Sequence, residues 1–176
     1  MDRIKSGEEF HEVQRFKSPF IRYSMAFMTL SFIVLFGNGA IQQIVYGKPW
    51  GTQPLSDITL ITTGAIIFFF MIALDFFFFC LHLTVTVKGD GLHINLFPLA
   101  KRTISFEEIK GSCPVTYNAI KEYGGWGIKN FAGKKTYTLS GNQGIELQLV
   151  DNTVILVGSQ HPHKLHECIS SHIKRT

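Results

Sequence analysis

The sequence predicts a membrane α-hairpin followed by a small α+β domain. Three observations lead to this fold class: two long apolar runs in the first half of the chain, a change to alternating apolar and polar residues after residue 83, and an apolar stripe with helical spacing near the C-terminus. The chain of 176 residues has room for one modest domain beside such a hairpin, but not for two large domains.

The two apolar runs are long enough to cross a bilayer. The first, residues 23–46, contains no charged side chain, and as a helix it would extend about 36 Å, more than the ~30 Å hydrocarbon core. The second, residues 58–83, is interrupted only by Asp75 and is apolar around its whole circumference, as expected for a helix in lipid. A signal peptide fits poorly, because residues 1–22 carry mixed charges before the first run. We expect a transmembrane hairpin over residues 23–83.

The positions of the basic residues predict the orientation of this hairpin. The loop at residues 47–57 holds only Lys48, whereas Lys88, Lys101 and Arg102 follow the second helix. The basic residues of the predicted cytoplasmic tail, residues 1–22, are Arg3, Lys5, Arg15, Lys17 and Arg22. Because cytoplasmic segments carry an excess of Lys and Arg, we expect a multi-pass protein of the cell membrane with both termini in the cytoplasm.

Asp75 is the one acidic residue expected inside the membrane. A functional interpretation is a proton or ion relay, or a polar contact that selects a partner helix. The structural interpretation is that Asp75 is protonated, accepts a hydrogen bond from Thr29 or Ser24 of the first helix, or pairs with Arg22. We favour the structural interpretation, because one isolated carboxylate in a two-helix hairpin does not make a transport path.

Residues 84–176 are expected to form a cytoplasmic domain of short strands closed by a helix. Asp90-Gly91 is a strong hairpin signal between two alternating segments, and Pro162 suits the first position of the final helix. Strands are predicted at residues 83–87, 92–96, 103–106, 126–130, 135–139, 144–150 and 153–157. The apolar stripe of the helix consists of Leu165, Ile169 and Ile173. The pattern predicts a small sheet or partial barrel, with the helix over its open face or one end.

The segment from Tyr123 to Trp126 is the most distinctive local feature of this domain. Exposed Tyr123 and Trp126 on a glycine-rich loop could contact the bilayer interface or a protein partner. Alternatively, the glycines supply positive φ angles while Trp126 packs in the core, which we favour. Lys88, Lys101 and Arg102 are candidate contacts for anionic lipid headgroups.

No pattern predicts a catalytic, metal-binding or cofactor-binding site. The glycine-rich residues 140–144 lack the Lys-Ser/Thr ending of a phosphate-binding loop, and no Cys or carboxylate set completes a metal shell around the histidines of residues 161–172. Cys80, Cys113 and Cys168 are far apart and odd in number, which argues against a disulfide framework. The net charge of +4 is spread thinly, so we expect no nucleic-acid partner.

Five sequence blocks that spread over nearly the whole chain are distinctive: residues 10–16, 42–51, 122–129, 140–147 and 155–162. They resemble blocks of an uncharacterised prokaryotic membrane family whose members carry two helices and a pleckstrin-homology-like (bacterial PH) domain. The resemblance implies a PH-like fold, which is a seven-strand bent antiparallel sheet or partial barrel capped by the C-terminal helix, and a scaffold or binding role. It implies no catalytic residue. One departure is His163-Lys164 after Pro162, where the family often has an acidic pair.

The sequence therefore leads to a functional hypothesis and two alternatives. We expect a non-enzymatic, membrane-anchored interaction module that binds an unknown protein partner or assembles into a homo-oligomer at the cytoplasmic membrane face. The first alternative is a module that binds lipid headgroups through its basic residues. A small transport or ion-relay component that uses Asp75 is the less favoured alternative.

Overall fold

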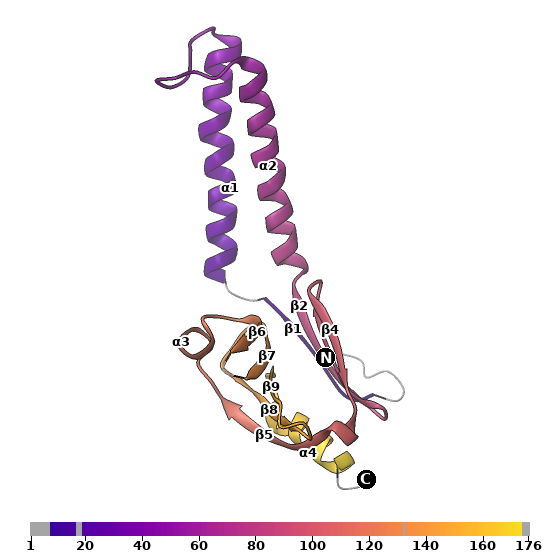
Figure 1. The fold of residues 1–176 in the computed structure, drawn as a ribbon. Helices are drawn as coiled ribbons and strands as arrows, with labels where there is room; N and C mark the ends of the chain where they lie inside the picture. The colour runs from indigo at the N-terminus through magenta and orange to yellow at the C-terminus, as the bar shows by residue number, and fades with distance from the viewer. Residues whose placement is uncertain (1–7, 17–18, 132, 174–176) are drawn as a thin grey trace. The chain divides into compact units, whose positions relative to one another are not determined.

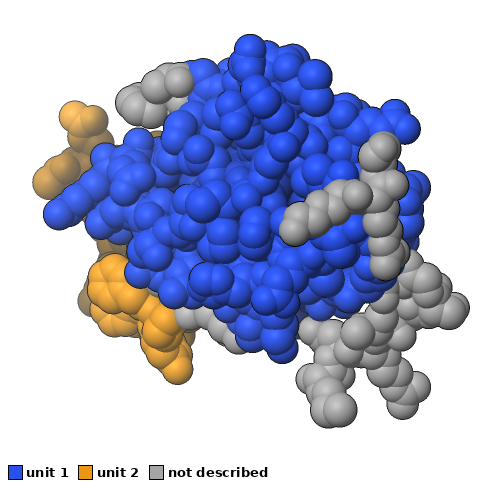
Figure 2. Space-filling view, turned by 90° about the horizontal axis from the view of Figure 1, so that it is seen from below, with its two compact units in different colours: residues 1–17, 80–176 blue, residues 18–79 orange. Residues whose placement is uncertain are grey.

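The computed structural model of the chain describes residues 8–16, 19–131 and 133–173 (Figure 1). Arg3, Lys5 and Lys17, which contribute to the predicted orientation, lie outside the described residues. The chain forms two compact units, coloured separately in Figure 2. Ser18–Phe79 form one unit, and Met1–Lys17 together with Cys80–Thr176 form the other.

The first unit is the predicted helical hairpin. It contains α1 (Pro19–Ala40), which continues into a π-helical turn (Ile41–Val45), and α2 (Asp57–Cys80). The 27 residues from Pro19 to Val45 and the 24 residues of α2 are each long and apolar enough to cross a membrane. The predicted second helix extended to residue 83, but α2 ends at Cys80 because a strand begins at His82.

Two glycines allow aromatic rings to pack closely within the hairpin. A Cβ atom on Gly64 of α2 would lie within van der Waals overlap of the Phe36 ring of α1, and a Cβ atom on Gly39 would overlap the indole of Trp50. The Phe36 and Trp50 rings meet edge to face with centroids 5.4 Å apart. The packing therefore depends on the missing side chains at these two positions.

Gln43 holds the loop that connects the two helices. Its side-chain Nε2 donates to the Leu55 carbonyl at 2.7 Å and to Asp57 Oδ1 at 2.8 Å. Its Oε1 accepts a hydrogen bond from the Trp50 backbone N–H at 3.3 Å. The Gln43 side chain thus connects the π-helical turn to Trp50 in the loop and to Leu55 and Asp57, where the loop ends and α2 begins.

The second unit begins with a four-stranded antiparallel sheet. Its strands, in the spatial order β1-β2-β3-β4, are β1 (Glu8–Arg15), β2 (His82–Lys88), β3 (Gly91–Phe97) and β4 (Ala100–Ile104). The sequence predicts a separate tail over residues 1–22, but the structure pairs β1 with β2 along its length. This unit therefore contains residues from both sides of the hairpin, whereas the predicted domain began at residue 84.

A second sheet follows, with spatial order β5-β8-β9-β7-β6. Its strands are β5 (Ile109–Thr116), β6 (Gly127–Phe131), β7 (Lys134–Thr138), β8 (Gln143–Leu149) and β9 (Val154–Gly158). A short helix, α3 (Ala119–Tyr123), lies between β5 and β6 in the chain. β7 pairs with β9 in parallel, so the expectation of a wholly antiparallel sheet is wrong for this pair.

The final helix, α4 (Pro162–Ile173), begins at the predicted proline. Leu165 and Ile169 of the predicted stripe are fully buried, and α4 packs mainly on β5, with further contacts to β8 and β1. Together the described residues form an α+β fold of two long apolar helices, two sheets and a C-terminal helix. The fully buried aliphatic residues of the sheets are Leu83, Val85, Val87, Leu92, Ile94, Leu96, Ile104, Ile145, Leu147, Ile155, Leu156 and Val157.

Candidate functional site

The glycine-rich segment after α3 forms a tight, capped corner. Asn118 caps α3, because its side chain accepts a hydrogen bond from the Lys121 N–H at 3.0 Å. Gly124 ends the helix in the left-handed conformation at φ 65°, and Gly125 and Gly127 also have positive φ angles. The predicted structural role of these glycines, which is to supply positive φ angles, is confirmed.

The corner places Tyr123 and Trp126 on a small apolar cluster. Both side chains are half-buried and pack against Tyr117, Ala119 and Leu156. The Trp126 Nε1–H donates to the Gly141 carbonyl at 2.9 Å, so the polar atom of the indole is satisfied within the domain. We name Tyr117, Tyr123 and Trp126 the aromatic corner. Trp126 is therefore neither a free surface residue nor a fully buried one.

Exposed isoleucines lie in the two elements that precede and follow the glycine-rich segment. Ile120 of α3 is 65% exposed and Ile128 of β6 is 40% exposed. Among the described strands, β6 has a neighbour on one side only, which is β7. An edge strand with exposed apolar side chains beside it can accept another strand or an apolar partner surface. We name Ile120, Tyr123 and Ile128 the β6-edge surface.

Tyr117 introduces a polar group into the buried side of this corner. The residue is 5% exposed, and its hydroxyl has no hydrogen-bond partner among the described residues. Its ring meets that of Tyr123 at a centroid distance of 6.2 Å. Burial raises the pKa of Tyr117 to about 12, because the phenolate would lose its hydration.

The three predicted headgroup contacts do not form one patch. Lys88 pairs with Gly91 at one end of β3, whereas Arg102 and Lys101 pair with Ile94 and Asn95, about 10–14 Å further along that strand. Lys101 and Arg102 are neighbours on β4, so their side chains leave opposite faces of the sheet. The pKa of Asp151 is lowered chiefly by its hydrogen bond from Thr153, with a further contribution from the charge of Arg102. Lys101 is exposed on the other face.

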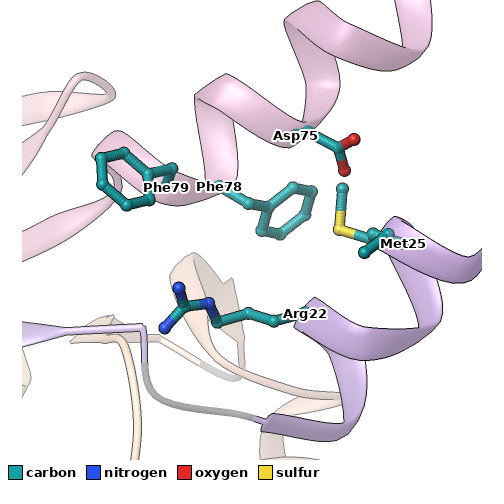
Figure 3. A pocket seen from close by; sticks show the side chains of 6 residues that line it. Arg22, Met25, Asp75, Phe78 and Phe79 are labelled. Atoms are coloured by element: carbon teal, nitrogen blue, oxygen red, sulfur yellow. The ribbon is translucent and has the colours of Figure 1, made fainter. Parts of the chain in front are cut away.

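Asp75 lies in a pocket of about 260 Å³ within the helical unit. Its Oδ2 accepts a hydrogen bond from the hydroxyl of buried Thr29 at 3.0 Å, which is one of the partners expected under the structural interpretation. Figure 3 shows the carboxylate turned toward Met25 of α1, with the Arg22 guanidinium directed away from it. The predicted alternative of an ion pair with Arg22 is thus absent from this arrangement of described residues.

The structure adds a buried polar network that the sequence does not reveal. The carboxylate of Glu12, which is 6% exposed, accepts hydrogen bonds from Ser159 Oγ at 2.6 Å, from the Gln160 N–H at 2.7 Å and from Gln14 Nε2 at 2.7 Å. Gln14 Nε2 also donates to the Gly158 carbonyl at 2.8 Å. The network ties β1 to the end of β9 and the start of α4. Ser159 is therefore part of the strand–helix junction.

Comparison with known families gives one match. Residues 1–175 match the family described as Family of unknown function (DUF6141). The chain belongs to this family. Comparison with curated proteins found no match. The DUF6141 match covers both the hairpin and the β domain, so the family model includes the two units together.

Two histidines of α4 in this DUF6141 member have structural contacts. His166 shares a hydrogen bond with Ser112 at 2.8 Å, and the His172 ring stacks on Phe106 while its Nε2 lies 3.2 Å from Glu9 Oε1. Among the residues that the structure describes, no group of three or more His, Cys, Asp or Glu side chains could hold a metal ion. All three cysteines lie in the described ranges and are free thiols.

Proposed function

We propose that α1 and α2 cross the cell membrane, with the β domain and both chain ends on its cytoplasmic face. The length and apolar composition of the two helices support this proposal. So does the exposure of large apolar side chains along both helices, which would be unfavourable in water. The most exposed of them include Phe27, Leu35, Phe69, Phe70, Phe76 and Phe79. The distribution of Lys and Arg supports the orientation.

The topology also supports a PH-like assignment for the domain. The meander β1 to β4 and the antiparallel set β5, β8 and β9 together supply seven strands, and α4 follows the last of them. In this interpretation the β6–β7 hairpin is an insertion that extends the second sheet. The transmembrane hairpin is a second insertion, between the first two strands.

The function that this arrangement supports best is a non-enzymatic, membrane-anchored interaction module. One observation carries the proposal: β1 and β2 are adjacent strands of one sheet, yet the hairpin lies between them in the chain. The domain is thus attached to the hairpin at both ends, and only Leu81 separates α2 from β2. Two short connections limit how far the domain can move from the bilayer surface. This restriction suits a scaffold that binds its partner close to the membrane.

The β6-edge surface is the proposed contact for a protein partner or a second copy of the chain. Its exposed isoleucines supply apolar area, the open edge of β6 supplies backbone hydrogen-bonding groups, and Tyr123 connects it to the apolar cluster of Tyr117, Ala119 and Leu156. The half-buried Tyr123 and Trp126 would fix the shape of the surface more than extend it.

The test is the mass of the full-length protein in mild detergent, measured by light scattering on purification from native membranes. We expect a defined complex, either an oligomer or a heteromer with a partner protein. The double variant Ile120→Lys/Ile128→Lys should dissociate it, whereas Val150→Lys, at an exposed position beyond β8, should not. A monomer that carries no partner, or equal behaviour of both variants, contradicts the proposal.

Lipid-headgroup binding remains the alternative, and the exposure of Lys101 favours it. It can be tested with a chain in which a Gly/Ser linker replaces residues 18–79, so that β1 and β2 still pair. Flotation of this chain with anionic liposomes that is lost in Lys101→Ala, but kept when the exposed apolar side chain nearby is removed in Leu99→Ser, would favour the alternative over protein binding. No flotation would favour the interaction module.

A further inference from the structure

The turn between β3 and β4 exposes apolar side chains. Phe97 is 43% exposed and Leu99 is 52% exposed, with Pro98 exposed between them. The turn is ordered by a hydrogen bond from the Leu99 N–H to the Leu96 carbonyl at 2.7 Å. The Phe97 ring also stacks on His82 at a centroid distance of 5.2 Å. We name residues 97–99 the apolar turn.

The register of the first sheet places the apolar turn close to the end of α2. Phe97 pairs with His82, the first residue of β2, and His82 comes two residues after Cys80, the last residue of α2. Two Cα–Cα steps of about 3.8 Å and one cross-strand distance of about 5.5 Å limit the separation of Cys80 and Phe97 Cα atoms to about 13 Å. The covalent chain alone sets this limit.

The other connection to the hairpin leaves from the same end of the sheet. Arg15, the last residue of β1, also pairs with His82, and α1 begins four residues later at Pro19. The opposite end of the sheet is polar, because its β2–β3 turn carries Asp90, whose Oδ1 lies 2.9 Å from His93 Nε2. The sheet therefore has an apolar tip at the end of both helix connections and a polar tip at the other.

Basic side chains flank the apolar turn. Arg15 is exposed at the end of β1, and Lys101 is exposed two residues after Leu99. An apolar turn between basic side chains favours insertion into the headgroup layer of an anionic membrane. The aromatic and aliphatic groups leave water, and the basic side chains contact lipid phosphates.

We propose that the apolar turn inserts into the headgroup layer of the bilayer that α1 and α2 cross. It is a third attachment of the domain, beside its two covalent connections, and it fixes the first sheet with the β1–β2 connection end toward the membrane. The proposal rests on the proposed membrane-spanning role of the hairpin.

The experiment uses the full-length protein, reconstituted in vesicles of phosphatidylcholine and phosphatidylglycerol. An environment-sensitive fluorophore is attached at Leu99→Cys, at Asp90→Cys in the opposite turn as the matched control, and at Phe69→Cys in α2, each in a background without the native cysteines. We expect iodide quenching at position 99 to be about threefold weaker than at position 90, and quenching by spin-labelled lipids at positions 69 and 99 but not at position 90.

Three outcomes separate the two proposals. Lipid quenching at positions 69 and 99 supports the insertion of the turn. Lipid quenching at position 69, with positions 90 and 99 equally open to iodide, overturns the insertion but leaves the spanning hairpin intact. Absence of lipid quenching at position 69 overturns both.

Amide hydrogen exchange of the unmodified protein provides a second measurement that needs no substitution. Exchange over residues 97–100 should be slower in anionic bilayer discs than in detergent, and exchange over residues 89–91 should be the same in both. Equal exchange of residues 97–100 in the two environments contradicts the proposal.

Discussion

Replacement of Glu12 should destabilise the β domain more than any surface acid. Glu12→Ala removes the acceptor for Ser159 Oγ and for the Gln160 N–H, whereas Gln14 Nε2 keeps its bond to the Gly158 carbonyl. Each lost bond to a buried charged acceptor contributes about 1–2 kcal/mol, so we expect a loss of about 2–4 kcal/mol. For a domain of this size that loss lowers the melting temperature by roughly 10–20 °C.

The assay is pulse proteolysis of the full-length protein in mild detergent across a urea series, with near-UV circular dichroism as a second probe. Glu107→Ala is the matched control, because Glu107 is exposed and should change the free energy of unfolding by less than about 0.5 kcal/mol. Ser159→Ala should lose part of the same energy, and its effect should not add to that of Glu12→Ala. If Glu12→Ala changes the free energy of unfolding as little as the control does, the network does not stabilise the domain as we expect.

Three further predictions concern buried polar groups and close packing. Tyr117→Phe should leave the domain as stable or slightly more stable, since it removes a buried hydroxyl without a hydrogen-bond partner. In the unmodified protein, an absorbance titration should show one tyrosine that ionises near pH 12. Because the pKa of Tyr117 is raised by folding, the domain should lose stability as the pH rises above 10. Asp75→Asn should keep the bond from Thr29, insertion and folding, and should show no specific change in proton or ion flux across proteoliposomes; a specific loss of flux would favour a relay. Gly39→Ala should destabilise the hairpin by about 1–3 kcal/mol in detergent–denaturant titrations, while Gly37→Ala, which meets nothing within 4 Å, should not; equal effects would refute the packing argument.

The elements that follow from local pattern could be predicted from the sequence. The two apolar runs predict α1 and α2, the alternation around Asp90-Gly91 predicts β2 and β3, and Pro162 with its apolar stripe predicts α4. These signals lie within single windows, so no knowledge of the tertiary fold is needed.

β1 could not be predicted for two physical reasons. Its inward-facing positions include Glu12 and Gln14, so the alternation of apolar residues is hidden by a buried polar network. Its partner β2 lies beyond the whole hairpin, and pairing over such a separation leaves no local signal. β5 was missed because Gly111 and Pro114 are unfavourable in strands.

The candidate site was only partly accessible from sequence. The Tyr123–Trp126 segment could be identified by its glycines, but the hydrogen bond from Trp126 to Gly141 depends on a turn that is distant in sequence. The apolar turn could not be identified from the sequence. Only the strand register, which pairs Phe97 with His82, shows that Phe97 and Leu99 lie at the end of the sheet where the connections to the helices leave.

The central proposal is that the helical hairpin, which the chain inserts between the adjacent strands β1 and β2, spans the membrane and holds the β domain on its cytoplasmic face. Its most direct test is labelling of intact cells with a membrane-impermeant maleimide, using single cysteines in place of Glu9 in β1, Lys48 in the loop and Asp90 in the β2–β3 turn. We predict labelling at position 48 from outside, and labelling at positions 9 and 90 only after permeabilisation. Labelling of positions 9 and 90 from opposite sides, or of all three from one side, would contradict the account.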